Sequence, residues 1–292
     1  MRQMAHAAGK TDDEHRYAAL FEKIKEAFNK AYVRSDGFVG GVAPPPVFAS
    51  GTARKLSDQP IDTQTSYVLS LYMNLLPNDL RSVSAKRLVD KIQANGWRLN
   101  TGFLGTPYLL EVLADTGYSD VAYRLLLNTE NPSWGYLVEH GATTMWERWN
   151  GDQMRGDPSM NSYNHYAYGA VAEWIYRYAA GVDTSPVDPG FRTVILRPLV
   201  PRFKALDFSY QSPYGKIHSE WTLSGKKASW TVTIPPNSRA WLLVSADGAN
   251  SFSVDGQPLT QSPKARRLED REGQGYELPA GTYSFSTKNV LK

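Results

Sequence analysis

Hydrophobic residues in the first two-thirds of the chain recur at helical spacing. In residues 12–34 they fall three and four positions apart behind an acidic first turn, which predicts an amphipathic helix. The same spacing predicts further helices over roughly 62–76, 79–94, 106–116, 119–128 and 162–181. The last of these is apolar almost all round, which indicates burial on several sides.

Two connecting segments are rich in Gly or in small polar residues. Residues 37–51 form a Gly- and Pro-rich stretch that is long for a connector, which indicates a functional role or packing against another element. Residues 100–107 lack the Lys and the spacing of a phosphate loop and predict a tight loop entering a helix. Before the helix at 62–76, Asp62 is the expected N-cap, with Gln64 in the first turn.

The pattern changes after Pro186. Short runs with alternating and β-branched residues follow, separated by turn residues, and they are typical of an antiparallel β-sandwich. The expected fold is therefore mainly α and then β, with domains at 1–185 and 186–292. About seven helices with short loops suit a bundle, a solenoid or part of an α/α barrel, and no fixed sequence period favours the solenoid.

Composition excludes several functions. The 292 residues include no Cys, which removes disulfides, thiolate nucleophiles and Cys-based zinc sites and fits a reducing, cytoplasmic location. A net charge of +3 with scattered Lys and Arg argues against nucleic acid as a partner. We expect no membrane span, and residues 1–10 lack the apolar run of a secretion signal. Aromatic residues are abundant, and such side chains pack cores but also contact sugar rings.

The densest group of candidate functional residues lies at 134–168, from Trp134 onward. Glu147 stands in a loop-like stretch between Trp146 and Trp149, with Arg148 beside it. Because exposed indoles are costly, this segment is expected to fold into a cleft in which the carboxylate activates a water. The residues support equally a structural alternative, in which Glu147 and Arg148 seal a helix end.

Asn164 and His165 open the last predicted helix. The neutral His ring both donates and accepts hydrogen bonds, which suits contact with sugar hydroxyls, although a capping role is the commoner use of a lone His. His140 follows Glu139 but lacks spaced partners, so we expect no metal site and no cofactor.

Five segments resemble the bacterial α-L-rhamnosidases of the inverting glycoside hydrolase type. They are AALFEKIKEAFNKAYV (18–33), DTQTSYVLSLYMNLLP (62–77), NTGFLGTPYLLEVLADTGYSDVAYRLLL (100–127), WGYLVEHGATTMWERWNG (134–151) and SMNSYNHYAYGAVAEWIYR (159–177). The order of GATTMWERW and NHYAYGAVAEWIYR is the most specific part of this resemblance.

The resemblance implies an (α/α)6 barrel followed by a β-sandwich, and a substrate with terminal α-L-rhamnose. It implies that Glu147 is the general base and that His165 contacts the sugar. The flanking Trp146 and Trp149, with Trp134 and Asn164, are the expected remaining substrate-binding residues.

One part of the family pattern has no match. The family's general acid belongs to an acidic, Arg-containing cluster in the first half of the barrel, whereas residues 12–16 of this chain begin an amphipathic helix. Seven helices are also too few for a twelve-helix barrel. We therefore expect residue 1 to lie inside a parent barrel, so that the chain alone is weakly active or inactive and associates with itself through an exposed barrel face.

Two other functions remain open from the sequence. A non-catalytic sugar-binding or scaffold protein would keep the aromatic cleft without turnover. Another α/α-barrel enzyme, such as a lyase acting on acidic polysaccharides, requires basic residues around the site, for which Arg148 and Arg155 are the candidates.

Overall fold

A computed structural model describes residues 1–41, 61–154, 156, 162–197, 202–225, 227–244, 246–268 and 275–287. Most of the Gly- and Pro-rich stretch at 37–51 therefore lies outside the described residues, as does Arg155. The chain divides into two compact units, Met1–Val171 and Ala172–Lys292.

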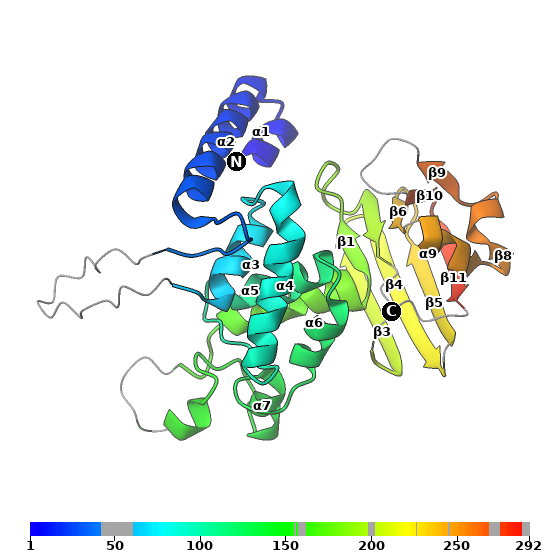
Figure 1. The fold of residues 1–292 in the computed structure, drawn as a ribbon. Helices are drawn as coiled ribbons and strands as arrows, with labels where there is room; N and C mark the ends of the chain where they lie inside the picture. The colour runs from blue at the N-terminus through cyan, green and yellow to red at the C-terminus, as the bar shows by residue number, and fades with distance from the viewer. Residues whose placement is uncertain are drawn as a thin grey trace, which may run out of the picture. The chain divides into compact units, whose positions relative to one another are not determined.

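The first unit is helical (Figure 1). Its α-helices are α1 (Arg2–Ala7), α2 (Thr11–Tyr32), α3 (Gln64–Tyr72), α4 (Asn78–Ala94), α5 (Thr106–Asp115), α6 (Ser119–Leu126) and α7 (Trp134–Glu139). Helices α2 to α6 confirm the predicted ranges to within a few residues, whereas α1 and α7 were not predicted.

The core of this unit is formed by the apolar stripes of α3 to α6. Fully buried members include Val68, Leu88, Ile92, Leu109 and Leu125. These are positions at helical spacing, so burial follows the sequence pattern. Tyr72, which the same spacing assigns to the inward side of α3, is exposed and stacks on Tyr108 instead.

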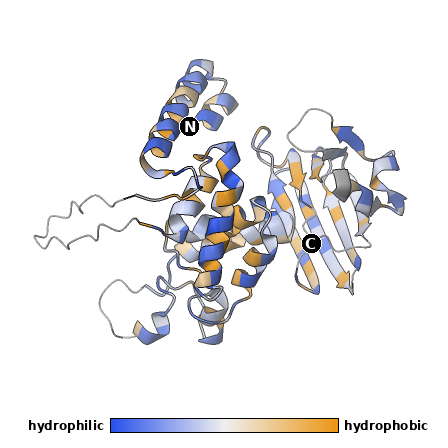
Figure 2. Ribbon diagram, in the orientation of Figure 1, coloured by the Kyte–Doolittle hydropathy of each residue, from blue (hydrophilic) through white to orange (hydrophobic). Residues whose placement is uncertain are grey.

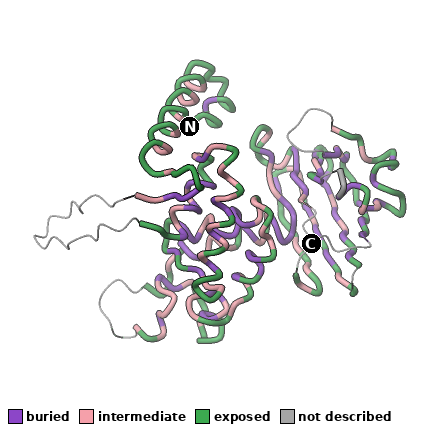
Figure 3. Tube along the Cα trace, in the orientation of Figure 1, coloured by how far each residue is buried: buried purple, intermediate pink, exposed green. Residues whose placement is uncertain are grey.

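Helix α2 differs from the other long helix, α4, because none of its residues is buried (Figure 3). Leu20 and Ile24 are exposed to 48% and 50%. Its attachment to the unit includes Asn29 Nδ2, which donates to the backbone oxygen of Leu75 over 2.7 Å. The amphipathic pattern therefore predicted the helix correctly, but the described residues cover its apolar stripe only in part.

The N-cap prediction for α3 was wrong by one residue. Thr63, in extended conformation, accepts the Ser66 backbone N–H with its side chain. Asp62 instead accepts the Tyr67 hydroxyl and pairs with Lys91 at 2.7 Å. Lys91 on α4 thus holds the Asp62 carboxylate, which is the stronger acceptor, and the hydroxyl of Thr63 caps the helix instead.

The last predicted helix begins five residues later than expected. It runs as a 3₁₀ turn (Ala167–Ala170), α8 (Val171–Trp174) and a π turn (Ile175–Ala179). It is less enclosed than its composition indicated, because Tyr166 and Tyr176 are exposed. Residues 162–165 are not helical, since their backbone groups are bonded to another loop, as described below.

The second unit contains two sheets. The first has the order β1 (Val182–Thr184), β2 (Thr193–Leu196), β6 (Arg239–Leu243), β10 (Gly275–Leu278) and β9 (Arg266–Leu268). The second has the order β3 (Ala205–Ser212), β4 (Gly215–Ser224), β5 (Lys227–Ile234), β11 (Gly281–Thr287), β7 (Phe252–Val254) and β8 (Gln257–Pro258). A short helix, α9 (Ala246–Ser251), precedes β7.

Residues from both sheets share one buried cluster, so the sheets pack face to face as a sandwich. Strand β5 shows why, because its alternate residues Ala228, Trp230, Val232 and Ile234 are all buried. In Figure 2, hydrophobic and hydrophilic bands follow one another along the strands. The antiparallel expectation holds for the described pairings except one, because β2 pairs with β6 in parallel. Two parallel neighbours require a long connection between them, and the chain between β2 and β6, which contains β3, β4 and β5, is that connection.

Two tryptophans occupy the centre of the sandwich. Trp221 and Trp230 are fully buried and stack with centroids 4.8 Å apart. Trp230 Nε1 donates to Ser219 Oγ over 2.8 Å, and Ser219 Oγ donates to the backbone oxygen of Ala180 over 2.6 Å. One buried hydroxyl therefore satisfies an indole N–H and the carbonyl at the end of the last helix.

We expect Ser219→Ala to lower the free energy of unfolding by about 1–3 kcal/mol, because the buried N–H and C=O lose their shared partner. Urea denaturation followed by tryptophan fluorescence measures this change. The control is Ser229→Ala, on the exposed face of β5, which is expected to have no measurable effect. Equal stability of the two variants would show that Ser219 contributes nothing.

Candidate active site

The segment around Glu147 begins with helix α7. Its N-cap is Ser133, which accepts the Tyr136 backbone N–H over 3.0 Å, and the helix ends before His140. Residues 141–150 then form a loop, as predicted. His140 stacks on Tyr136, with centroids 3.8 Å apart.

The Glu147 loop is bonded through its backbone to the segment before the last helix. The backbone N–H of Glu147 donates to the Ser162 oxygen over 2.9 Å, and that of His165 donates to the Met145 oxygen over 2.8 Å. The hydroxyl of Thr144 also donates to the oxygen of Tyr163. These bonds prevent residues 162–165 from joining the helix. They also bring Glu147 and His165, which are 18 positions apart in sequence, onto two loop segments that lie side by side.

The two indoles beside Glu147 have different surroundings. Trp146 is buried in a small cluster with Tyr136 and Leu137. Trp149 stacks on Tyr168 at 3.9 Å and meets the edge of Trp134 at 5.4 Å. Trp134 is itself fixed, since its Nε1 donates to the backbone oxygen of Tyr168. Packing on both neighbours therefore restrains the backbone of Glu147.

Glu147 is a buried carboxylate, with 7% of its surface exposed. Its Oε2 accepts the backbone N–H of Ser162 over 2.7 Å. Burial raises the pKa of the Tyr168 hydroxyl, and the negative charge of Glu147 raises it further. The Glu147 carboxylate thus lies within electrostatic reach of the aromatic group formed by Tyr168, Trp149 and Trp134.

His165 is half-buried in a second aromatic contact. Its ring stacks on Phe103 with centroids 4.6 Å apart, and Phe103 also meets Tyr168 at 5.4 Å. Nδ1 accepts the Ala167 backbone N–H over 3.3 Å, which leaves Nε2 as the protonated nitrogen of a neutral ring. His165 therefore caps the helix and presents a donor. Asn164 is exposed, and its backbone N–H donates to Ser162 Oγ.

The structure thus groups Glu147, Trp149, Trp134 and His165, whereas Trp146 faces the cluster with Tyr136 and Asn164 faces solvent. Sequence reasoning missed Phe103 and Tyr168. Phe103 lies in the predicted loop at 100–107 and Tyr168 in a segment interpreted as core. No local pattern indicates that Phe103 contacts the His165 ring or that Tyr168 contacts the Trp149 ring.

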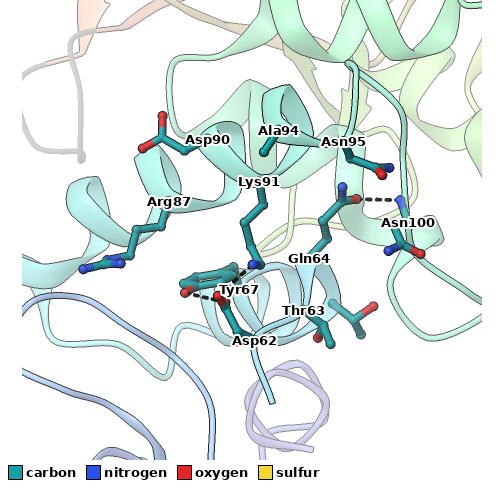
Figure 4. Close-up of a pocket in the computed structure, with 11 residues that line it drawn as sticks. Asp62, Thr63, Gln64, Tyr67, Arg87, Asp90, Lys91, Ala94, Asn95 and Asn100 are labelled. Atoms are coloured by element: carbon teal, nitrogen blue, oxygen red, sulfur yellow. Dashed lines mark hydrogen bonds and ion pairs between the residues drawn. The ribbon is translucent and has the colours of Figure 1, made fainter. Parts of the chain in front are cut away.

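A polar cavity of about 720 Å³ lies at the start of α3 (Figure 4). Its lining includes Asp62, Gln64, Lys91 and Asn100. Gln64 accepts the Asn100 backbone N–H over 2.7 Å and donates to the Arg98 oxygen. Burial, and next the Asp62 carboxylate, raise the pKa of Tyr67 to about 12. The loop from Asn100 to Gly105 leads from this cavity to Phe103 and so to His165.

The described residues contain no group of three or more His, Asp or Glu side chains placed to hold a metal ion. Within the same residues, no helix combines the length and the apolar character needed to cross a bilayer.

Two family models match the chain. The bacterial α-L-rhamnosidase six-hairpin glycosidase domain matches residues 1–179, and the bacterial α-L-rhamnosidase C-terminal domain matches residues 181–257. The chain belongs to the bacterial α-L-rhamnosidase family. This confirms the resemblance, the fold class of a helical barrel part followed by a β-sandwich, and the glycoside hydrolase family.

Individual relatives agree with this assignment. An α-L-rhamnosidase of Streptomyces avermitilis is 43% identical over 84% of the chain, and one of Formosa agariphila is 33% identical over 98%. The crystal structure of the Streptomyces avermitilis enzyme with L-rhamnose superposes with a TM-score of 0.77 at 37% identity, covering 98% of the chain and 25% of that enzyme. The chain spans 22% and 29% of the lengths of the two sequence relatives.

The proximity of Glu147 to Tyr168 is testable by titration. We expect Glu147→Gln to lower the pKa of Tyr168, because a negative charge that opposes the phenolate is removed. The pKa remains above its ordinary value, since burial is the larger cause. NMR titration of ¹³C-labelled tyrosines measures the Tyr168 pKa in the unsubstituted chain and in the variant.

Glu139→Gln, which removes an exposed carboxylate at the end of α7, serves as the control. An unchanged Tyr168 pKa in Glu147→Gln would contradict the geometry.

Proposed function

We propose that this chain carries the general-base part of an inverting α-L-rhamnosidase site, with Glu147 as the base. The observation that supports this role most directly is the buried carboxylate held by a backbone N–H beside an aromatic group. One oxygen, Oε2, accepts the Ser162 N–H, which fixes the orientation of the carboxylate. A carboxylate fixed in this way abstracts a proton from a water without first reorganising.

The surrounding rings give this base a substrate face. Phe103 and the edge of the Trp149–Tyr168 stack offer apolar surface to the C–H groups of a pyranose. We assign the Nε2 proton of His165 to a hydrogen bond with a sugar hydroxyl, which the contact of Nδ1 with the helix supports. The Streptomyces avermitilis enzyme was crystallised in complex with L-rhamnose, and we extend that ligand to this chain as the terminal α-L-rhamnosyl group of a glycoside.

Inversion needs a second carboxyl group. The acid protonates the leaving oxygen while the base deprotonates water on the opposite face, at a separation of about 6.5–9.5 Å. We assign this acid to a part of the family's barrel that this chain does not contain. The chain alone is therefore expected to hydrolyse α-L-rhamnosides very weakly or not at all.

The test places this chain in a full-length context. In a chimera, it replaces the matching segment of the Streptomyces avermitilis enzyme, and hydrolysis of an aryl α-L-rhamnoside is followed. We expect Glu147→Gln to reduce kcat by about 10²–10⁴-fold, the usual contribution of general acid–base catalysis. Proton NMR of the active chimera is expected to show β-L-rhamnose as the first product.

Glu139→Gln is the matched control and is expected to retain full turnover. Turnover in the chimera that survives Glu147→Gln would refute the assignment of the base, and α-L-rhamnose as the first product would refute inversion. Appreciable Glu147-dependent turnover by the chain alone would refute the assignment of the acid.

His165 is expected to act mainly on binding. In the same chimera, His165→Ala removes one hydrogen bond worth about 0.5–1.5 kcal/mol, so KM rises about two- to tenfold with a smaller change in kcat. His15→Ala, on exposed α2, is the control. A variant that changes only the melting temperature would show that His165 is a helix cap and no more.

A further inference from the structure

A second cavity lies entirely within the residues of the second unit. It has a volume of about 320 Å³, near the lower end of the range for small-molecule sites. Four aromatic side chains line it, namely Tyr176, Phe191, Phe208 and Tyr210. None of them belongs to the group around Glu147.

The aromatic walls are partly open to solvent. Tyr176 meets Phe208 at 5.0 Å, and Phe191 meets Tyr210 at 4.8 Å, each pair tilted by less than 50°. Tyr176 is 47% exposed and Tyr210 is 38% exposed. Phe208 and Tyr210 are two positions apart on β3, so they share one face of the strand. Strand β3 forms one edge of its sheet (Figure 1). A protein surface that gathers exposed rings around a hollow is typical of a ligand site.

Phe191 adds an independent sign of function. Its φ is +69°, a left-handed conformation that a bulky residue rarely adopts. Its backbone is held there by the Ser238 hydroxyl, which donates to its oxygen over 2.9 Å. Strain of this kind persists where the surroundings impose it, and it concentrates at binding sites.

The polar lining of this cavity is already ordered. Arg177 Nε donates to Asp183 Oδ2 over 2.9 Å, and its Nη1 donates to Glu173 Oε1 over 3.2 Å. The lining thus carries two carboxylates and one guanidinium, all planar and fixed by mutual ion pairs. Carboxylates accept hydrogen bonds from hydroxyls and a guanidinium donates them, so these groups suit adjacent hydroxyls on a ring. With no excess positive charge, the cavity does not favour an anionic ligand.

We propose that this cavity is a non-catalytic binding site for a neutral pyranoside, distinct from the site at Glu147. Aromatic rings contact the C–H face of the sugar, and the Glu173–Arg177–Asp183 group bonds its hydroxyls. A 6-deoxy sugar fits best, because its methyl group adds apolar surface. The choice of L-rhamnose as ligand rests on the proposed function, whereas the existence of the site does not.

The experiment uses residues 1–292 and methyl α-L-rhamnopyranoside as the probe. NMR spectra of ¹³C-labelled Tyr and Phe rings are recorded during sugar titration. We expect shifts at Tyr176, Phe191, Phe208 and Tyr210 that saturate together. D-Glucuronate is expected to give no saturable shifts there. Glu147→Gln leaves the titration at these four rings unchanged.

Substitutions then test the aromatic contacts. Tyr176→Ala and Tyr210→Ala are each expected to weaken binding at this cavity about three- to tenfold, the loss of one aromatic contact. Tyr210→Phe keeps the ring and retains most of the affinity. Tyr32→Ala removes a similarly exposed ring on α2 and is the matched control.

The proposal is overturned if the four rings of the unsubstituted chain do not respond, if glucuronate binds as well, or if Tyr32→Ala weakens binding as much as Tyr210→Ala. The ring titration needs no variant, so a misfolded substitution leaves it decisive. Saturable shifts at these rings together with an inactive chimera would reject only the proposed function. An active chimera with silent rings would reject only this site.

Discussion

The candidate active site depends on the backbone pairing between residues 144–147 and 162–165. Glu147 and Ser162 exchange two hydrogen bonds, one of which ends on the Glu147 side chain, and His165 is tied to Met145. A loop is a poor platform for catalysis unless something fixes it, because a side chain displaced by about 1 Å loses much of its effect. Here two loops fix each other, and the surrounding rings fill the space between them and the helices.

The same pairing explains the shape of the following helix. Because residues 162–165 give their backbone groups to the loop, the helix starts late and in 3₁₀ geometry, with His165 as a cap. The functional interpretation and the capping interpretation of His165 are therefore compatible, since Nδ1 serves the helix and Nε2 remains for a ligand. The structure shows the contact with the helix, and the contact of Nε2 with a sugar stays a proposal.

Local periodicity predicted most elements of the fold. Alternation marked β5 and the burial of Trp230, and helical spacing marked α4 and the burial of Ile92. Interactions between distant segments were not predictable. The parallel pairing of β2 with β6, the late start of the last helix and the contact of Phe103 with His165 all join residues far apart in sequence. The predicted N-cap of α3 was wrong for a related reason, because Lys91 on another helix forms an ion pair with Asp62.

The end of the last helix shows that the boundary between the two family models is not a boundary between independent structural units. The family models meet near residue 180, yet the carbonyl of Ala180 accepts the hydroxyl of Ser219 deep in the sandwich, and the carbonyl of Gly181 accepts the Arg197 N–H. Gly181 leaves no room for a side chain against the oxygen of Arg197. An excised sandwich that began at residue 181 would therefore lack the acceptor for a hydroxyl buried at its centre. A stable excised domain must keep the final helical turn, so genetic dissection of this protein should cut upstream of that turn.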